Sequence, residues 1–213
     1  MTKKTITYTT TNSYETLNTI GNSTKNIWIV FHGLGYLSRY FLNYFKDLKP
    51  EENYIIAPQA PSKYYLKNDF RHVGASWLTK EDTLQETKNV MAYINAVMKA
   101  ETIDPNCRFI VFGFSQGVSI AARWVANFKI PCAKLIFYAG GIPNELKPSD
   151  FLFLNKHNTE VISVVGDSDE YLTSERMKSE TQKMNLLFQN NAKQIKFEGG
   201  HEIKKDIITW LAD

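Results

Sequence analysis

Cysteine and long apolar runs are scarce in this chain. Its 213 residues include two cysteines, Cys107 and Cys132, without a Cys-x-x-Cys spacing, so we expect two reduced thiols and no disulfide framework. The longest apolar runs have about five residues, which is too short to span a bilayer. Two lysines near the N-terminus precede no apolar stretch, so we expect no signal peptide. These absences predict a cytoplasmic protein without integral membrane association.

A large excess of charge of one sign is also missing. The chain has 25 basic and 22 acidic residues, a net charge of +3, and its lysines are spread along the sequence. This balance lacks the strongly basic character of nucleic-acid-binding domains, so we predict no nucleic-acid partner. No repeat, low-complexity segment or Pro-, Gly- or Ser-rich linker interrupts the sequence. We therefore predict a single domain over residues 1–213.

The chain does contain apolar runs that alternate with stretches of helical periodicity. Strands are predicted at residues 27–31, 54–57, 109–112, 134–138, 160–165 and 195–197, and the continuous apolar run at 27–31 is typical of a strand covered on both faces. Helices are predicted at about 39–48, 79–101 (with Thr79 and Asp82 as a capping box), 116–128, 174–190 and after 201. Residues 5–18 indicate an exposed antiparallel edge, and 62–76 an irregular, aromatic-rich loop.

This alternation predicts an α/β fold with a mostly parallel central sheet and helices on both faces. Ligand sites in such sheets gather at the carboxyl ends of the strands. The segments that bear glycines or polar residues fall at those predicted ends, at 32–36, 113–117, 166–170 and 199–201.

A serine stands at the apex of one of these segments, Gly113-Phe114-Ser115-Gln116-Gly117. A strand precedes this G-x-S-x-G motif and a helix follows it, which is the setting of a nucleophile elbow. The small glycines let strand and helix pack closely, so that the turn holds Ser115 in a strained conformation with its hydroxyl exposed.

A serine nucleophile needs a base and a carboxylate that orients the base. In proteins with this elbow motif, the three residues come in the chain order serine, acid, histidine. Only His157 and His201 of the four histidines come after Ser115, and His201 follows a strand beside two glycines, so it is the predicted base. Asp167, Asp169 and Glu170 lie past the strand that ends near residue 165. Spacing alone leaves these acids open, although the turn after Gly166 favours Asp169.

An acyl-transfer site also needs backbone N–H groups aimed at the developing oxyanion. Gln116, the residue after the serine, supplies one candidate. The loop His32-Gly33-Leu34-Gly35 supplies the other through Leu34. We interpret His32 as a structural support of this loop.

The ordered set of motifs resembles the small carboxylesterase, lysophospholipase and acyl-protein thioesterase family of α/β-hydrolases. The matching segments are His32-Gly33-Leu34-Gly35, Ala57-Pro58-Gln59-Ala60-Pro61, Ser76-Trp77, Gly113-Phe114-Ser115-Gln116-Gly117, Gly166-Asp167-Ser168-Asp169 and Gly200-His201-Glu202-Ile203. The resemblance implies an α/β-hydrolase fold, a triad of Ser115, Asp169 and His201, and an oxyanion hole from the amides of Leu34 and Gln116. It implies an ester or thioester, lysophospholipids included, as the small-molecule substrate, and neither metal nor cofactor.

Two positions depart from the family pattern. Val118 replaces a third glycine after the elbow, and Tyr36 replaces an aspartate after the H-G-L-G stretch. Both alter the rim of the site. Tyr36, Arg71 and Trp77 are therefore candidates for the substrate pocket. Trp77 fits the core equally well, and the charge of Arg71 suits either an acidic leaving group or a solvated loop.

Two other functions compete with this interpretation. A non-catalytic, hydrolase-like binding protein would keep the pocket but is expected to carry a degraded triad. A dienelactone-type hydrolase generally has cysteine at the elbow, where this chain has Ser115.

Overall fold

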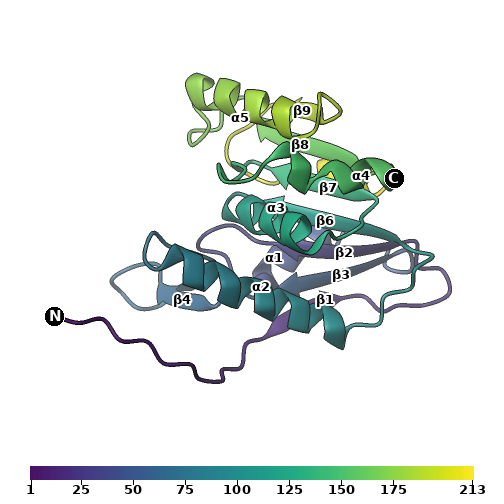
Figure 1. Ribbon diagram of the computed structural model, residues 1–213. Helices are drawn as coiled ribbons and strands as arrows, with labels where there is room; N and C mark the ends of the chain where they lie inside the picture. Colours follow the sequence, from purple (N-terminus) through teal and green to yellow (C-terminus); the bar gives the residue numbers. More distant parts are fainter.

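The computed structural model describes residues 1–213 and contains one seven-stranded sheet (Figure 1). Its strand order is β1-β3-β2-β6-β7-β8-β9, and every neighbouring pair is parallel except β1 with β3. The strands are β1 Tyr14–Leu17, β2 Asn26–Phe31, β3 Asn53–Pro58, β6 Arg108–Phe114, β7 Lys134–Tyr138, β8 Glu160–Gly166 and β9 Lys193–Phe197. The predicted mostly parallel sheet is confirmed. The antiparallel edge predicted over residues 5–18 is confined to β1, and residues 5–13 form no strand.

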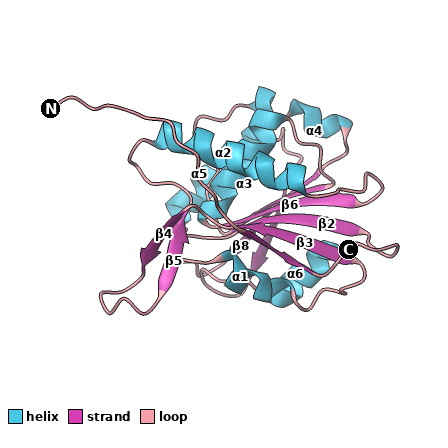
Figure 2. Cartoon of the chain, turned by 90° about the horizontal axis from the view of Figure 1, so that it is seen from below, coloured by secondary structure: helices cyan, strands magenta, loops and turns pink.

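Helices cover both faces of the sheet because the buried strands present apolar side chains to both sides (Figure 2). On one face of the sheet, Ile29 and Phe31 of β2 pack in a core with one group of helices. On the other face, Trp28 and Val30 pack in a core with a second group. The first group is α2 Thr83–Ala100, α3 Gln116–Phe128, α4 Leu152–Lys156 and α5 Ser174–Leu187; the second is α1 Ser38–Phe41, a 3₁₀ turn Leu42–Phe45 and α6 Lys205–Ala212. None of these helices has the length and apolarity that crossing a membrane requires.

Two predicted helices are shorter than expected. The segment predicted as a helix over 39–48 is one turn of α-helix followed by a 3₁₀ turn. Leu42, Phe45 and Leu48 are buried at intervals of three residues, which matches the 3₁₀ period. The helix predicted from residue 79 begins at Thr83, and its capping box is wrong because Asp82 has a left-handed backbone (φ 47°) and makes no side-chain cap.

The sequence predicted an irregular loop over residues 62–76, and this prediction is wrong. They form a two-stranded antiparallel hairpin, β4 Ser62–Tyr65 and β5 Val73–Ser76, which projects from the body of the molecule (Figure 2). All four residues of β4 are exposed, so the strand carries no alternation of buried and exposed side chains that would mark it in the sequence.

Candidate active site

Ser115 lies between the last residue of β6 and the first of α3, in a strained backbone conformation (φ 53°, ψ −116°). Few residues other than glycine adopt a positive φ, and those that do gather at functional sites. The flanking glycines are needed for space. A Cβ on Gly117 would lie 2.1 Å from the carbonyl oxygen of Phe31, and one on Gly113 would lie 2.5 Å from that of Gly117. The elbow therefore packs directly against the end of β2.

His201 joins Ser115 to Asp169 through two hydrogen bonds. Its Nε2 atom lies 2.9 Å from Oγ of Ser115, and its Nδ1 atom lies 2.8 Å from Oδ2 of Asp169. The Asp169 side chain is fully buried, while the histidine side chain is 15% exposed. Ser115, Asp169 and His201 follow β6, β8 and β9, so all three lie at carboxyl ends of parallel strands. The structure thus brings together the three residues that the sequence singled out.

The two other acids considered for this position make different contacts. Asp167 accepts hydrogen bonds from the N–H of Gly199 (3.1 Å) and the hydroxyl of Ser168 (2.9 Å), and these bonds lower the pKa of its carboxyl. Glu170 is exposed and has no hydrogen bond to His201. Asp169 is therefore the acid that contacts the imidazole.

Aromatic rings and a backbone N–H fix the histidine and the acid. Phe114 and Tyr171 pack on His201 with ring centroids 5.2 and 4.7 Å away. The N–H of Tyr171 donates to Oδ1 of Asp169 at 2.9 Å, so this carboxylate accepts a bond on each oxygen. No sequence motif singles out Tyr171, and its place two residues after Asp169 is the only signal for it.

Gln116 directly follows Ser115, Gly33 brings the loop of Leu34 close to it, and the N–H groups of both predicted oxyanion donors are free of backbone acceptors. A Cβ on Gly33 would lie 3.2 Å from Cβ of Ser115, so the loop after β2 reaches the elbow. The N–H of Leu34 makes no hydrogen bond within the protein, and Gln116 begins α3, where the first N–H groups have no intrahelical acceptor.

His32 anchors this loop from inside the protein. It is fully buried, its Nε2 accepts from the N–H of Ala60 (3.1 Å), and its Nδ1 lies 2.8 Å from the carbonyl oxygen of Gly33. Burial lowers the pKa of His32 to about 4. The ring is therefore neutral, and its Nδ1–H donates to Gly33.

The side chain of Gln116 ties the elbow to the segment that follows β5. Its Oε1 accepts from the N–H of Trp77 (2.9 Å), and its Nε2 donates to the carbonyl oxygen of Leu78 (2.7 Å). At the same place, the N–H of Gly35 donates to the carbonyl oxygen of Ala75 (2.9 Å). The hairpin end, the oxyanion loop and the elbow thus form one connected unit, which no local sequence pattern reveals.

The three candidates for the substrate pocket separate into two environments. Tyr36 and Arg71 line a cavity of about 320 Å³ between the hairpin and α1. Trp77 is 1% exposed and its indole N–H donates to the carbonyl oxygen of His32 (2.8 Å), so it belongs to the core and not to this cavity. Its large apolar ring is held between β2 and the helices, where it packs on Phe31.

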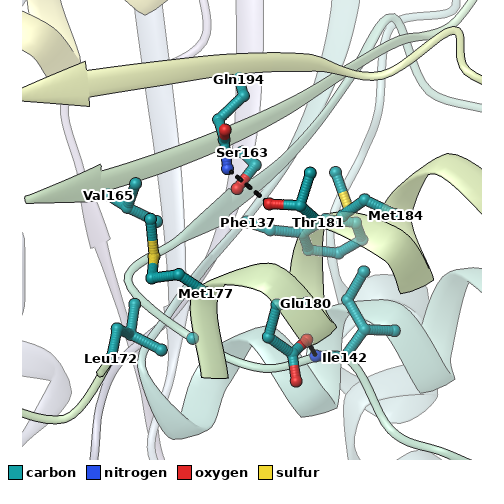
Figure 3. Close-up of a pocket in the computed structure, with 11 residues that line it drawn as sticks. Phe137, Ile142, Ser163, Val165, Leu172, Met177, Glu180, Thr181, Met184 and Gln194 are labelled. Carbon is teal, nitrogen blue, oxygen red and sulfur yellow. Dashed lines mark hydrogen bonds between the residues drawn. The ribbon is translucent and has the colours of Figure 1, made fainter. Parts of the chain in front are cut away.

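A second cavity lies between α5 and strands β7 to β9 (Figure 3). Its volume is about 20 Å³, room for roughly one water molecule and not for a substrate. One wall is closed by Glu180, whose carboxylate accepts from the N–H of Ile142 at 3.0 Å. No group of three or more His, Cys, Asp or Glu side chains is arranged to hold a metal ion.

Comparisons with known proteins agree with this architecture. The family model described as Phospholipase/Carboxylesterase matches residues 14–212. No curated protein sequence matches the chain. Several solved structures superpose over almost the whole length of both chains.

Three of these structures illustrate the similarity. Acyl-protein thioesterase 2 from Zea mays has a TM-score of 0.70 and 15% identity, covering 95% of this chain and 96% of its own. A phospholipase/carboxylesterase from Dyadobacter fermentans has a TM-score of 0.64 and 20% identity, covering 97% of both chains. The Bacillus cereus carboxylesterase has a TM-score of 0.64 and 15% identity, covering 94% and 92%.

These identities are too low to indicate more than the fold, which is that of the α/β-hydrolases. The family model, in contrast, matches nearly all of the chain. The protein therefore belongs to the phospholipase/carboxylesterase family of α/β-hydrolases and is an ester-hydrolysing enzyme.

Proposed function

We propose that the protein hydrolyses carboxylic esters through an acyl-enzyme on Ser115, with His201 as general base and Asp169 as its orienting acid. The observation that carries the proposal is the unbroken hydrogen-bond chain from the Ser115 hydroxyl through the imidazole to a buried carboxylate. A serine hydroxyl attacks a carbonyl only when a base within hydrogen-bonding distance takes its proton.

The proton positions follow from this arrangement. Asp169 accepts a hydrogen bond from Nδ1–H of His201, so the proton stays on that nitrogen. Nε2 then has a lone pair that points toward the hydroxyl of Ser115. When Nε2 takes the serine proton, the buried carboxylate stabilises the imidazolium that forms. The strained backbone at Ser115 holds the hydroxyl at the strand end during this transfer.

The N–H groups of Leu34 and Gln116 stabilise the tetrahedral intermediate in this proposal. Both belong to backbone that is fixed elsewhere, by His32 under the loop and by the Gln116 side chain on the segment after β5. Donors that are already in place do not have to reorganise as the oxyanion forms, and each such donor contributes about 10²- to 10³-fold to kcat.

The remaining steps complete the cycle. Imidazolium His201 protonates the leaving alcohol or thiol, and the acyl group stays on Ser115. A water molecule then gives its proton to Nε2 and attacks the acyl carbon, and the serine leaves with the proton returned from the histidine. All proton transfers use groups of this chain, so this mechanism requires no cofactor.

The substrate class that we propose is a small-molecule carboxylic ester, with thioesters and lysophospholipids as members of the same chemistry. The cavity of about 320 Å³ beside the oxyanion loop supports a ligand of this size.

The proposal is tested by measuring kcat for p-nitrophenyl esters and thioesters of increasing chain length with wild type, Ser115→Ala and Ser119→Ala. Ser119 lies one turn along α3, where its hydroxyl donates to the carbonyl oxygen of Gln116, and is the matched control. We expect Ser115→Ala to lose all turnover above background and Ser119→Ala to remain within about threefold of wild type. Undiminished turnover by folded Ser115→Ala would refute the assignment.

A further inference from the structure

The cavity between the hairpin and α1 carries positive charge without any negative charge in its walls. Among its nine lining residues are Arg39 from α1 and Arg71 and His72 from the hairpin, and none is acidic. Figure 2 shows the hairpin and α1 near each other below the plane of the sheet. Segments more than thirty residues apart in the sequence thus supply the two arginines to one cavity.

Neither guanidinium is paired with an acid or a hydrogen-bond acceptor of the protein. Arg39 and Arg71 form no ion pair and no side-chain hydrogen bond, and Arg39 lies 4.9 Å over the ring of Tyr40. The nearest hairpin acid, Asp69, accepts from the backbone N–H of Arg71 (3.1 Å) and does not line the cavity. Each arginine therefore keeps its full set of donors for a ligand.

The cavity also adjoins the candidate active site. Gly35 lines it and directly follows Leu34, one of the proposed oxyanion donors. Tyr36 lines it as well, and its ring lies 5.9 Å from that of Phe114, which in turn lies 5.2 Å from the ring of His201. Tyr36 in the wall of the cavity is therefore linked to His201 of the proposed triad through one further ring, that of Phe114.

We propose that this cavity binds an anionic group of the ester substrate, a carboxylate or a phosphate, and makes the enzyme selective for acidic esters. The inference rests on the proposed function, because it assigns a second subsite to the same reaction. Arginine suits this task because its planar fork donates two parallel hydrogen bonds to a carboxylate or phosphate. The apolar walls beside it, Leu37 and Val73 among them, accommodate the short alkyl chain between the anionic group and the ester.

The test compares kcat/KM for matched anionic and neutral esters. Monoethyl adipate against ethyl hexanoate places the charge on the acyl side, and 6-acetoxyhexanoate against hexyl acetate places it on the alcohol side. The phosphate 6-acetoxyhexyl phosphate distinguishes phosphate from carboxylate. Each ratio of anionic to neutral ester is measured at low and at high salt with wild type, Arg39→Gln, Arg71→Gln and the double variant.

We expect an anionic ester on at least one side to be preferred by wild type, and each arginine substitution to lower that ratio roughly threefold to tenfold. High salt should lower the wild-type ratio in the same direction because both arginines are exposed. Lys67→Gln is the charge-matched control. Lys67 is an exposed cation on the same hairpin that does not line the cavity, and its substitution should leave the ratio unchanged.

Two results would overturn the inference. One is a preference for the neutral ester in every pair, and the other is a ratio that the double variant leaves intact or that Lys67→Gln lowers equally. Either result can occur while Ser115→Ala abolishes hydrolysis of all the esters, so the subsite fails separately from the proposed function. Circular dichroism and thermal unfolding of each variant exclude a loss of folding as the cause.

Discussion

Gly74 of the hairpin has no room for a side chain, so Gly74→Ala tests whether the hairpin positions the oxyanion loop. A Cβ at this residue would lie 2.5 Å from the carbonyl oxygen and 2.8 Å from Cα of Gly35. It would also lie 2.6 Å from the end of the Leu66 side chain, which can rotate away, whereas the Gly35 backbone cannot. To restore a tolerable separation of about 3.0 Å, the loop or β5 must move by about 0.5 Å.

This displacement acts on the residue next to Leu34 and on the hydrogen bond from Gly35 to Ala75. Loss of one oxyanion donor lowers kcat by about 10²- to 10³-fold. Since the donor is misplaced and not removed, we expect kcat to fall by about 10- to 100-fold, or about 1.4 to 2.7 kcal/mol in the activation free energy. KM for a short neutral ester should change less than kcat, because the contact with the oxyanion forms mainly in the transition state.

Steady-state kinetics with p-nitrophenyl acetate measure both constants, and Gly21→Ala is the control, because a Cβ on Gly21 would have no atom within 4 Å. A folded Gly74→Ala variant with the kcat of wild type would show that the hairpin does not position the oxyanion loop. An equal loss of activity in Gly21→Ala would show the same.

Three further predictions follow from the geometry. Asp169→Asn should lower kcat about 10⁴-fold because an amide favours the wrong tautomer of His201. The control Asp167→Asn should keep kcat within about threefold of wild type, and ester hydrolysis at saturating substrate measures both values. Gln116→Glu should lower kcat about tenfold with little change in KM, since a carboxylate cannot donate to the carbonyl oxygen of Leu78. An unchanged kcat would show that this hydrogen bond does not position the oxyanion hole. Burial lowers the pKa of His32 from 6.5 to about 4, so the unfolded chain binds this proton more tightly than the folded chain. The free energy of unfolding should therefore fall by about 3 kcal/mol as the pH drops from about 6.5 to 4. Urea unfolding at several pH values should show this one-proton slope in wild type and not in His32→Gln.

The sequence predicts most of the catalytic centre because its parts carry local signals. The glycines around Ser115 mark a turn that only small residues permit, and chain order leaves His201 as the histidine after a late strand. The choice of Asp169 over Asp167 needs the structure. Both follow the same glycine, and only the path of the loop decides which carboxylate faces the imidazole.

The surroundings of the centre are harder to predict because they depend on contacts between distant segments. The strand β4 exposes every side chain, so the hairpin has no apolar period that the sequence could reveal. Its contact with Gly35 is made by backbone atoms of Gly74 and Ala75, which leave no trace in residue type beyond one glycine. The side chain of Gln116 reaches Trp77 and Leu78 across about forty residues of sequence.

Covalent labelling shows whether Ser115 is the residue that becomes acylated and whether His201 is its base. Wild type, Ser115→Ala and His201→Ala are treated with a fluorophosphonate, and intact-protein and peptide mass spectra locate the added mass. We expect one adduct per wild-type chain, carried by the peptide that contains Ser115, and none in Ser115→Ala. Labelling of His201→Ala should be slower by at least about 10³-fold. An adduct on another residue, or equal labelling of folded Ser115→Ala, would contradict this assignment.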